Sequence, residues 1–325
     1  MKYAFILADL RAYPLSVVCC VLGVTQSGFH AWKVRKPSRR AHERQHLSAE
    51  IRQVFDAQRG RYGAPRIYRV LCEQFGYTGS LNRIQTLMRA MGICAKAGKK
   101  FKVTTDSAHS LPVAPNLLGQ DFSCDTSLAS TSHAKAPDQV WLSDITYLWT
   151  REGWLYVCAV LDLFTRRIVG WAIAEHMTRQ LVLDALQMAT TVRKPAPGLI
   201  FHSDRGSQYA SHEVRAWLAG RAMRQSMSGA GNCYDNAPME SYWHSMKVEE
   251  THGQDFATRA EAKNCLFTYI EGWYNTTRIH SSLGYKSPAQ FERDCNAKSI
   301  TAANDEQTAI LRNTSQPARL QQRAA

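Results

Sequence analysis

Strand-like and helix-like hydrophobic patterns follow one another in the second half of the chain. Three apolar runs at residues 139–150, 153–164 and 166–175 are separated by short turns and predict three antiparallel strands. The pattern then alternates between helical spacing and short apolar runs, predicting helix 178–192, strand 198–204, helix 212–220 and strand 224–228. Strands followed by alternating helices and strands indicate an α/β domain with a mixed five-stranded sheet, here expected across residues 137–295.

Helical patterns dominate the first hundred residues. Residues 15–33 read as two short helices around a turn at Gly23, with Thr25 able to cap the second helix. This is typical of a helix-turn-helix, although an αα-hairpin in any helical domain has the same pattern. The basic run KVRKPSRRAHER that follows favours DNA as the partner.

A second helical set is expected at residues 48–92. Its basic connections fit either further DNA binding or a solvated helical spacer. We therefore expect an all-α DNA-binding region over residues 1–103. Residues 104–136 are rich in Ser, Thr, Ala and Pro without a period, which predicts a linker. Residues 296–325 are polar and aperiodic and are expected to form a disordered tail.

Composition narrows the class of partner. The 325 residues carry a formal net charge of +13, which favours a polyanion such as nucleic acid. The nine cysteines are scattered, and no CxxC pair occurs, which argues against a disulfide framework or a zinc ribbon and for a reducing cytoplasm. The apolar run PLSVVCCVLGV is too short to span a bilayer and has Asp9 and Arg11 before it, so no membrane association is expected.

The first candidate for chemistry is a carboxylate inside a strand. Asp144 lies in a run that is apolar on both faces, which predicts a central strand. Burying a carboxylate there is costly unless its charge is compensated, and no basic residue lies within the same strand. Either a bound divalent cation or a position at an open edge of the sheet would resolve this conflict.

Two further carboxylates occur at positions typical of ligand sites. Asp204 directly follows a short strand, where side chains gather at the carboxyl edge of an α/β sheet, although one such Asp can simply order a loop. Glu240 follows Pro238 in the first turn of a helix, where a negative charge is favoured in any case. Together, three carboxylates in a basic α/β protein match what two magnesium ions need for phosphodiester chemistry.

Three segments resemble the catalytic segments of insertion-sequence transposases with a retroviral-integrase-like core: WLSDITYL, FHSDRGSQYAS and NAPMESYWHSMKVE. The 35 residues between Asp204 and Glu240 agree with the D, D, 35, E spacing of that family. LGVTQSGFHAW resembles the start of the second reading-frame product of the IS-three group, and YNTTRIHSSLGYKSPAQF resembles the segment that closes these cores. The resemblance extends to about Glu292.

The resemblance implies an RNase H-like core in which Asp144, Asp204 and Glu240 are the catalytic residues and bind two Mg²⁺ ions, with Mn²⁺ able to substitute. It implies a DNA transposase that cleaves at terminal inverted repeats and joins the strands to target DNA. It further implies a homo-oligomer on DNA and a frameshift fusion with an upstream DNA-binding product, in the bacterial cytoplasm at the nucleoid. Two alternatives stay open: an RNase H-like nuclease that only hydrolyses, and an inactive DNA-binding regulator.

Lys247 is expected on the same helix face as Glu240, about 10 Å further along the helix, and therefore not as a simple ion-pair partner. The family has a basic residue at this offset, which could hold the phosphate backbone. The alternative is an exposed, solubilising lysine. Asn236, Gln208, Ser207 and Tyr209 match motif positions that flank the carboxylates, and they are expected to shape the active-site loops or to touch DNA. Further DNA contacts are expected at Arg205, Thr25 and Gln26.

Two histidines near these motifs are given minor roles. His244 and Glu240 have the spacing of a zinc-ligand pair, but no second His or Cys lies nearby at ligand spacing. His244 is therefore interpreted as a surface residue or an incidental DNA contact. His202 could act as a general base, but packing is the expected role.

Overall fold

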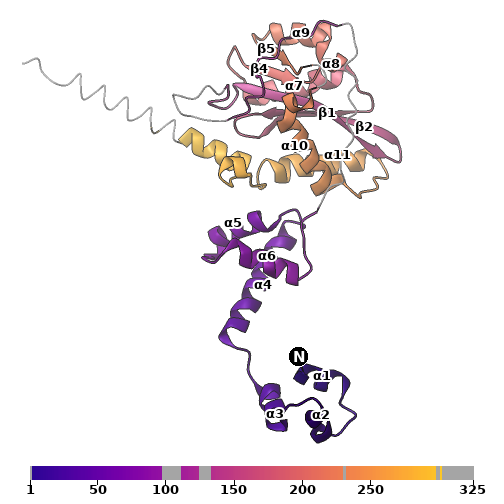
Figure 1. Ribbon diagram of the computed structural model, residues 1–325. Helices are drawn as coiled ribbons and strands as arrows, with labels where there is room; N and C mark the ends of the chain where they lie inside the picture. The colour runs from indigo at the N-terminus through magenta and orange to yellow at the C-terminus, as the bar shows by residue number, and fades with distance from the viewer. Residues whose placement is uncertain (1, 97–110, 124–132, 230–231, 298–300, 302–325) are drawn as a thin grey trace, which may run out of the picture. The chain divides into compact units, whose positions relative to one another are not determined.

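The computed structural model describes residues 2–96, 111–123, 133–229, 232–297 and 301. The chain divides into two compact units, residues 1–95 and residues 96–325 (Figure 1). The first unit is entirely helical over its described residues, and the second contains the sheet.

The first three helices pack around a small apolar cluster. They are α1 (Lys2–Asp9), α2 (Leu15–Val21) and α3 (Gln26–Val34). Helix α3 turns by 105° from α2, within the range of helix-turn-helix pairs. Gly23 has φ +60° in the turn between them, and Thr25 Oγ1 accepts a hydrogen bond of 3.1 Å from Gly28 N. The predicted turn and cap are therefore confirmed, whereas α1 was not predicted.

The second helical set consists of α4 (Arg39–Ala57), α5 (Ala64–Phe75) and α6 (Leu81–Ala90). Apolar residues of all three helices fill their common core, among them Ile51, Ile67 and Ile84, which are inaccessible to solvent. Helix α4 begins at Arg39 instead of near residue 48. Its first two turns are exposed on all sides, so the hydrophobic period that predicts a helix starts only at Leu47.

The second unit is built on a mixed sheet with the strand order β3-β2-β1-β4-β5. The strands are β1 (Val140–Thr150), β2 (Gly153–Asp162), β3 (Ile168–Ala174), β4 (Ile200–Ser203) and β5 (Arg224–Met227). Strands β1 to β3 pair antiparallel, while β4 lies parallel to both β1 and β5. The predicted five-stranded α/β sheet is confirmed, and β1 lies at its centre.

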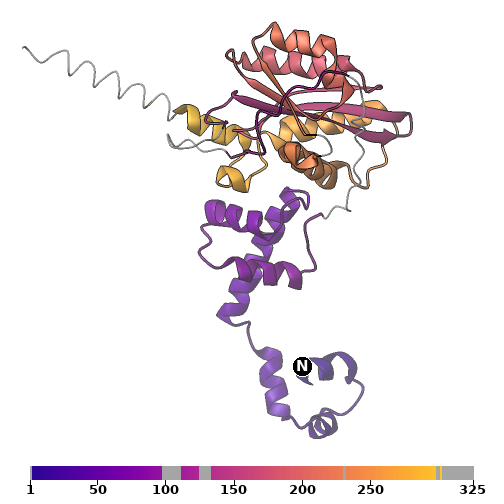
Figure 2. The same cartoon turned by 45° about the horizontal axis from the view of Figure 1, so that its top comes forward.

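Helices cover both faces of this sheet (Figures 1 and 2). Helices α7 (Arg179–Arg193) and α9 (His212–Ala219) lie on one face and share its core with Trp141 and Phe201. Helices α10 (Ala237–Met246) and α11 (Arg259–Phe267) lie on the other. The short α8 (Ser207–Ala210) follows β4, and the 3₁₀ turn η1 (Cys233–Asn236) leads into α10.

The C-terminal segment continues through two π-helical turns, η2 (Lys247–Thr251) and η3 (Thr268–Tyr274), and a 3₁₀ turn, η4 (Ser281–Leu283). Beyond η3, the Asn275 side chain pairs with both backbone groups of Ile168, accepting from its N–H at 2.9 Å and donating to its carbonyl at 3.0 Å. Asn275 therefore covers the start of the edge strand β3, as expected for a segment that closes the core.

Part of the predicted linker, residues 111–123, lies against the sheet domain. Leu117 N donates to Ser226 Oγ on β5 at 2.9 Å, and Leu118 is buried. The rest of the predicted linker, apart from residues 133–136, lies outside the described residues. Of the predicted tail, only residues 296, 297 and 301 are described.

Among the described residues, no single helix is long and apolar enough to cross a membrane. The bent pair of α2 and α3 passes such a test when the two helices are taken together, on the basis of length and composition alone.

Candidate active site

Two carboxylates from other elements act electrostatically on Asp144 of the central strand. Asp144 lies on β1, Asp204 directly follows the neighbouring parallel strand β4, and Glu240 lies in the first turn of α10. Burial, the negative charge of Asp204 and, to a smaller extent, that of Glu240 raise the pKa of Asp144 to about 8. Asp144 therefore lies within electrostatic reach of both other carboxylates, in a central strand and not at an open edge of the sheet.

The two oxygens of Asp144 have different hydrogen-bond donors. The N–H of Ile145 donates to Oδ1 at 2.8 Å, and the indole N–H of Trp243 donates to Oδ2 at 3.1 Å. Both bonds favour the ionised carboxylate and so oppose the rise in its pKa. The sequence analysis missed Trp243, although its position three residues after Glu240, on the same helix face, could have drawn attention to it.

Asp204 is partly buried, whereas Glu240 is exposed. Asp204 Oδ1 accepts a hydrogen bond of 3.0 Å from Gly206 N, so this carboxylate also orders the loop after β4. Glu240 is the most exposed of the three carboxylates, yet neighbouring atoms remove enough water to raise its pKa above the usual range.

A buried polar layer supports β1 on the face opposite to α10. The Ser143 hydroxyl donates to the Ala159 carbonyl at 2.9 Å and lies 3.0 Å from the Tyr209 hydroxyl. Cys158 lies beside both, and burial raises the pKa of its thiol to about 12. A thiol with such a pKa stays protonated near neutral pH, so we assign this layer to support of the strand and not to chemistry.

Asn236 joins the start of α10 to β1. It is only 4% exposed, and its Nδ2 donates to the Ser143 carbonyl at 3.2 Å. Its Oδ1 is buried and has no hydrogen-bond partner among the described residues. Asn236 was expected to shape the active-site loops or to touch DNA, and in the structure it is enclosed and holds the start of the helix that carries Glu240.

Lys247 lies at the end of α10, on the side of the carboxylates. Its Nζ lies 5.5 Å from the ring centre of Tyr147 on β1. Burial lowers the pKa of Lys247, and the nearby charge of Asp144 opposes that shift. The side chain is half-buried, which does not match a fully exposed, solubilising lysine.

The other predicted site residues divide between the sheet domain and the helical unit. Arg205 and Gln208 are half-buried beside Asp204, and they donate to the carbonyls of Ser228 at 2.6 Å and Met177 at 3.3 Å. Thr25 and Gln26 are exposed at the start of α3, in the helical unit.

The two histidines differ sharply in exposure. His244 is exposed on α10. His202 is fully buried between Ser226 Oγ, 2.8 Å from its Nδ1, and Ser228 Oγ, 3.3 Å from its Nε2. Burial lowers the pKa of His202 to about 4, so a packing role suits it better than general base catalysis.

The chemistry of the carboxylate site fits a hard divalent cation. Among the described residues, no group of three His, Cys, Asp or Glu side chains is arranged so that it could hold a metal ion. Asp144 and the two residues whose negative charges reach it are all carboxylates, the ligands that Mg²⁺ and Mn²⁺ prefer. Burial and, after it, the charges of Asp204 and Glu240 raise the pKa of Asp144, and a bound cation would offset both effects.

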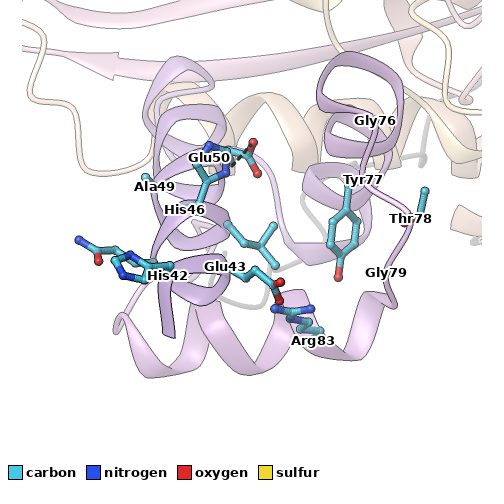
Figure 3. Close-up of a pocket in the computed structure, with 12 residues that line it drawn as sticks. His42, Glu43, His46, Ala49, Glu50, Gly76, Tyr77, Thr78, Gly79 and Arg83 are labelled. Atoms are coloured by element: carbon cyan, nitrogen blue, oxygen red, sulfur yellow. Dashed lines mark ion pairs between the residues drawn. The ribbon is translucent and has the colours of Figure 1, made fainter. Parts of the chain in front are cut away.

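The helical unit offers basic surface beside α4. A groove of about 560 Å³ between α4 and α6 is lined by Arg40, Arg44 and Arg83, together with Glu43, Asn82, Thr86 and Leu87. A larger neighbouring pocket has mixed charge, with His42, His46, Glu50 and Arg83 around it (Figure 3). Of the two, the arginine-lined groove better fits a phosphate backbone.

Known families match both units of the chain. Family models described as integrase core domain match residues 134–233 and 240–294, and one described as HTH-like domain matches residues 42–101. The chain is 43% identical over 294 residues to "Transposase InsF for insertion sequence IS3A" of Escherichia coli (strain K12). The alignment covers 90% of this chain and 98% of that protein. The chain is 42% identical over 274 residues to the "Insertion element IS600 uncharacterized 31 kDa protein" of Shigella sonnei, covering 84% and 97%.

A solved structure of the HTLV-2 integrase catalytic core domain in complex with magnesium aligns with 48% of this chain and 97% of its own, at 13% identity and a TM-score of 0.34. That likeness is too distant to carry an argument about this chain. The family matches define the class, a protein with an HTH-like domain and an integrase core. The chain belongs to the family of IS3 insertion-sequence transposases, as the resemblance of its motifs implies.

Proposed function

We propose that this chain is a DNA transposase that cuts phosphodiester bonds at insertion-sequence ends and joins the freed 3′ ends to new phosphodiesters. In the second step one phosphodiester bond forms as another breaks, so no external energy source is needed. The observation that carries the proposal is that the charges of Asp204 and Glu240 reach Asp144 from two other elements, in a chain of the IS3 transposase family.

Asp144, Asp204 and Glu240 would hold two Mg²⁺ ions, for which Mn²⁺ can substitute. Such ions activate the attacking oxygen and stabilise the leaving oxygen when they are bound. The protein contributes the arrangement of the carboxylates. Strand β1 carries Asp144 at the centre of the sheet, and α10 presents Glu240 beside it.

Basic and polar residues would hold the DNA. Lys247, which directly follows α10, would bind the phosphate backbone of the end being cut, with Arg205 and Gln208 beside the loop of Asp204. In the helical unit, Gln26 and the rest of the exposed face of α3 would enter the major groove, because helix-turn-helix domains read DNA with the second helix.

The assembly on DNA follows from the reaction. Joining two ends requires at least two active sites in reach of each other, so we propose a homo-oligomer on the terminal repeats. A frameshift fusion with an upstream DNA-binding product would add further contacts to the ends. Cleavage and joining would take place in the bacterial cytoplasm, at the nucleoid.

The test is cleavage and joining of a labelled duplex that carries the element's own end, with Mg²⁺ or Mn²⁺. Asp204→Asn and Glu240→Gln would be compared with the wild type, and binding of the same duplex would be measured in parallel. Joined products from the wild type alone are expected. Nicking without joining would favour a hydrolytic nuclease, and tight binding without any cleavage would favour a DNA-binding regulator.

A further inference from the structure

Asp144 is held by a donor that comes from the helix of Glu240. The indole N–H of Trp243 donates to Asp144 Oδ2 at 3.1 Å, and Trp243 is only 6% exposed. A buried indole N–H needs a hydrogen-bond partner, and here the partner is the carboxylate at the centre of the site. The bond therefore joins α10 directly to the candidate metal ligand of β1.

A second side-chain hydrogen bond joins β1 to the end of η1, the turn that leads into α10. Asn236 Nδ2 donates to the carbonyl of Ser143, the residue before Asp144. Asn236 is the last residue of η1 and directly precedes α10, whereas Trp243 lies within α10. Asn236 donates to a backbone carbonyl of β1 and Trp243 to a side chain of β1. Glu240 lies between them in sequence. The two bonds thus tie the chain to β1 on both sides of Glu240.

The neighbours of Trp243 hold its ring in place. The Tyr242 ring lies 4.7 Å from it, centre to centre, and Tyr242 packs in turn on Tyr274 of η3 at 4.9 Å. All three rings are buried. A donor enclosed in this way has little freedom to turn, so it can determine the orientation of the carboxylate that it binds.

We propose that Trp243 is a positioning residue that orients Asp144 for divalent-cation binding. This inference rests on the proposed function and adds a residue to its site. A carboxylate oxygen has two lone-pair directions, so Oδ2 can accept the indole N–H and still face a cation. Hydrogen bonds from such outer residues typically account for roughly 10- to 100-fold in metal affinity.

The chain offers a matched control for Trp243. Trp171 on β3 also donates its indole N–H to a carboxylate, Glu271 Oε1, at 2.8 Å, outside the candidate site. Trp243→Phe and Trp171→Phe each remove one indole–carboxylate bond and keep an aromatic ring. The affinity of each full-length variant for Mn²⁺ alone would be measured by calorimetry, with thermal unfolding in the absence of metal as the measure of fold.

We expect Trp243→Phe to bind Mn²⁺ at least about 10-fold more weakly than the wild type, within the range for such outer residues. Trp171→Phe should bind it as the wild type does. Unchanged or tighter binding by folded Trp243→Phe would overturn the inference. Absence of Mn²⁺ binding in the wild type would instead overturn the metal site, so the two failures can be told apart.

A second measurement does not depend on the folding of Trp243→Phe. The indole N–H groups of the eight tryptophans can be followed by ¹⁵N NMR in the full-length wild type and in Asp144→Asn. One indole resonance should move both in Asp144→Asn and when Mg²⁺ is added to the wild type. If no indole resonance responds to either change, the proposed contact does not orient Asp144.

Discussion

Arg278 and Glu249 form a buried ion pair next to the C-terminal end of the helix that carries Glu240. Arg278 Nε lies 2.9 Å from Glu249 Oε2, Arg278 Nη2 lies 2.7 Å from Oε1, and each residue is 5% exposed. The hydroxyl of Tyr269 donates to the same carboxylate at 2.8 Å. Glu249 lies in η2, directly after α10, so this cluster joins the end of α10 to the C-terminal segment.

Arg278→Met should destabilise the sheet domain strongly, because it leaves the charge of Glu249 buried without its partner. Breaking a buried pair typically costs about 3–5 kcal/mol. Urea unfolding of the full chain, followed in the transition of the sheet domain, measures the loss. The double variant Arg278→Met, Glu249→Met removes both charges and should recover most of the stability. A single variant as stable as the wild type would contradict the expected role of the pair.

The strands and the carboxylates could be predicted from the sequence because both depend on local pattern. Alternating and continuous apolar runs place the strands to within a few residues, and the position of Asp144 in a run apolar on both faces predicts a central strand. The spacing of Asp204 and Glu240 carries the family resemblance, which the comparisons confirm.

The partners of the buried polar groups could not be predicted in this way. Trp243 reads as a core aromatic and Asn236 as a loop residue, because the acceptor that each reaches belongs to β1, some ninety or more residues earlier in the chain. The π-helical turn that contains Lys247 has no hydrophobic period of its own. Such contacts follow from packing between distant segments and leave no local signal.

Asp162 provides a test of pH dependence away from the candidate site. It is fully buried at the end of β2 and accepts hydrogen bonds from Asp138 N at 2.7 Å and from Thr165 N and Oγ1 at 2.7 and 2.8 Å. Burial raises its pKa from 3.8 to about 6 in spite of these donors. The folded state therefore binds this proton more tightly than the unfolded state, and the associated stability is lost as the pH rises from about 4 through 6.

Asp162→Asn should remove this pH dependence. From pH 4 to pH 7, the unfolding free energy of the wild type should fall relative to that of the variant by on the order of 2–3 kcal/mol. Urea unfolding at several pH values measures it. Asp255→Asn is the control of opposite sign, because the hydrogen bond and charge of Arg151 lower the pKa of Asp255. The wild type should therefore become more stable relative to Asp255→Asn as the pH rises. A pH-independent difference for Asp162→Asn would refute the expectation.

The arginine-lined groove of the helical unit makes a prediction about salt. If Arg40, Arg44 and Arg83 contact DNA phosphates, replacing all three with Ala should weaken binding of any duplex and flatten its salt dependence. Each lost contact should reduce the slope of log K against log salt concentration by about 0.9. Fluorescence anisotropy at a series of salt concentrations measures this slope. Arg52→Ala is the control, because Arg52 is exposed on the same helix and does not line the groove.

Lys247 can be separated from the carboxylates by its effect on DNA. Lys247→Met keeps the aliphatic length of the side chain and removes the charge that we propose to hold the phosphate backbone. Binding of the element's end in the presence of a chelator should weaken, and joining should fall by roughly 10-fold, as for the loss of one charged hydrogen bond of about 1.5 kcal/mol. Because the side chain is half-buried beside Tyr147, thermal unfolding should be followed as well.

Lys263→Met is the matched control for charge, because Lys263 is exposed on α11. Loss of the same charge there should leave both binding and joining close to those of the wild type. If Lys247→Met behaves like Lys263→Met, Lys247 serves solubility and not the DNA. If Lys247→Met keeps full binding but loses joining, the charge of Lys247 acts on Asp144, with which it interacts electrostatically. The phosphate contact must then be assigned to another residue.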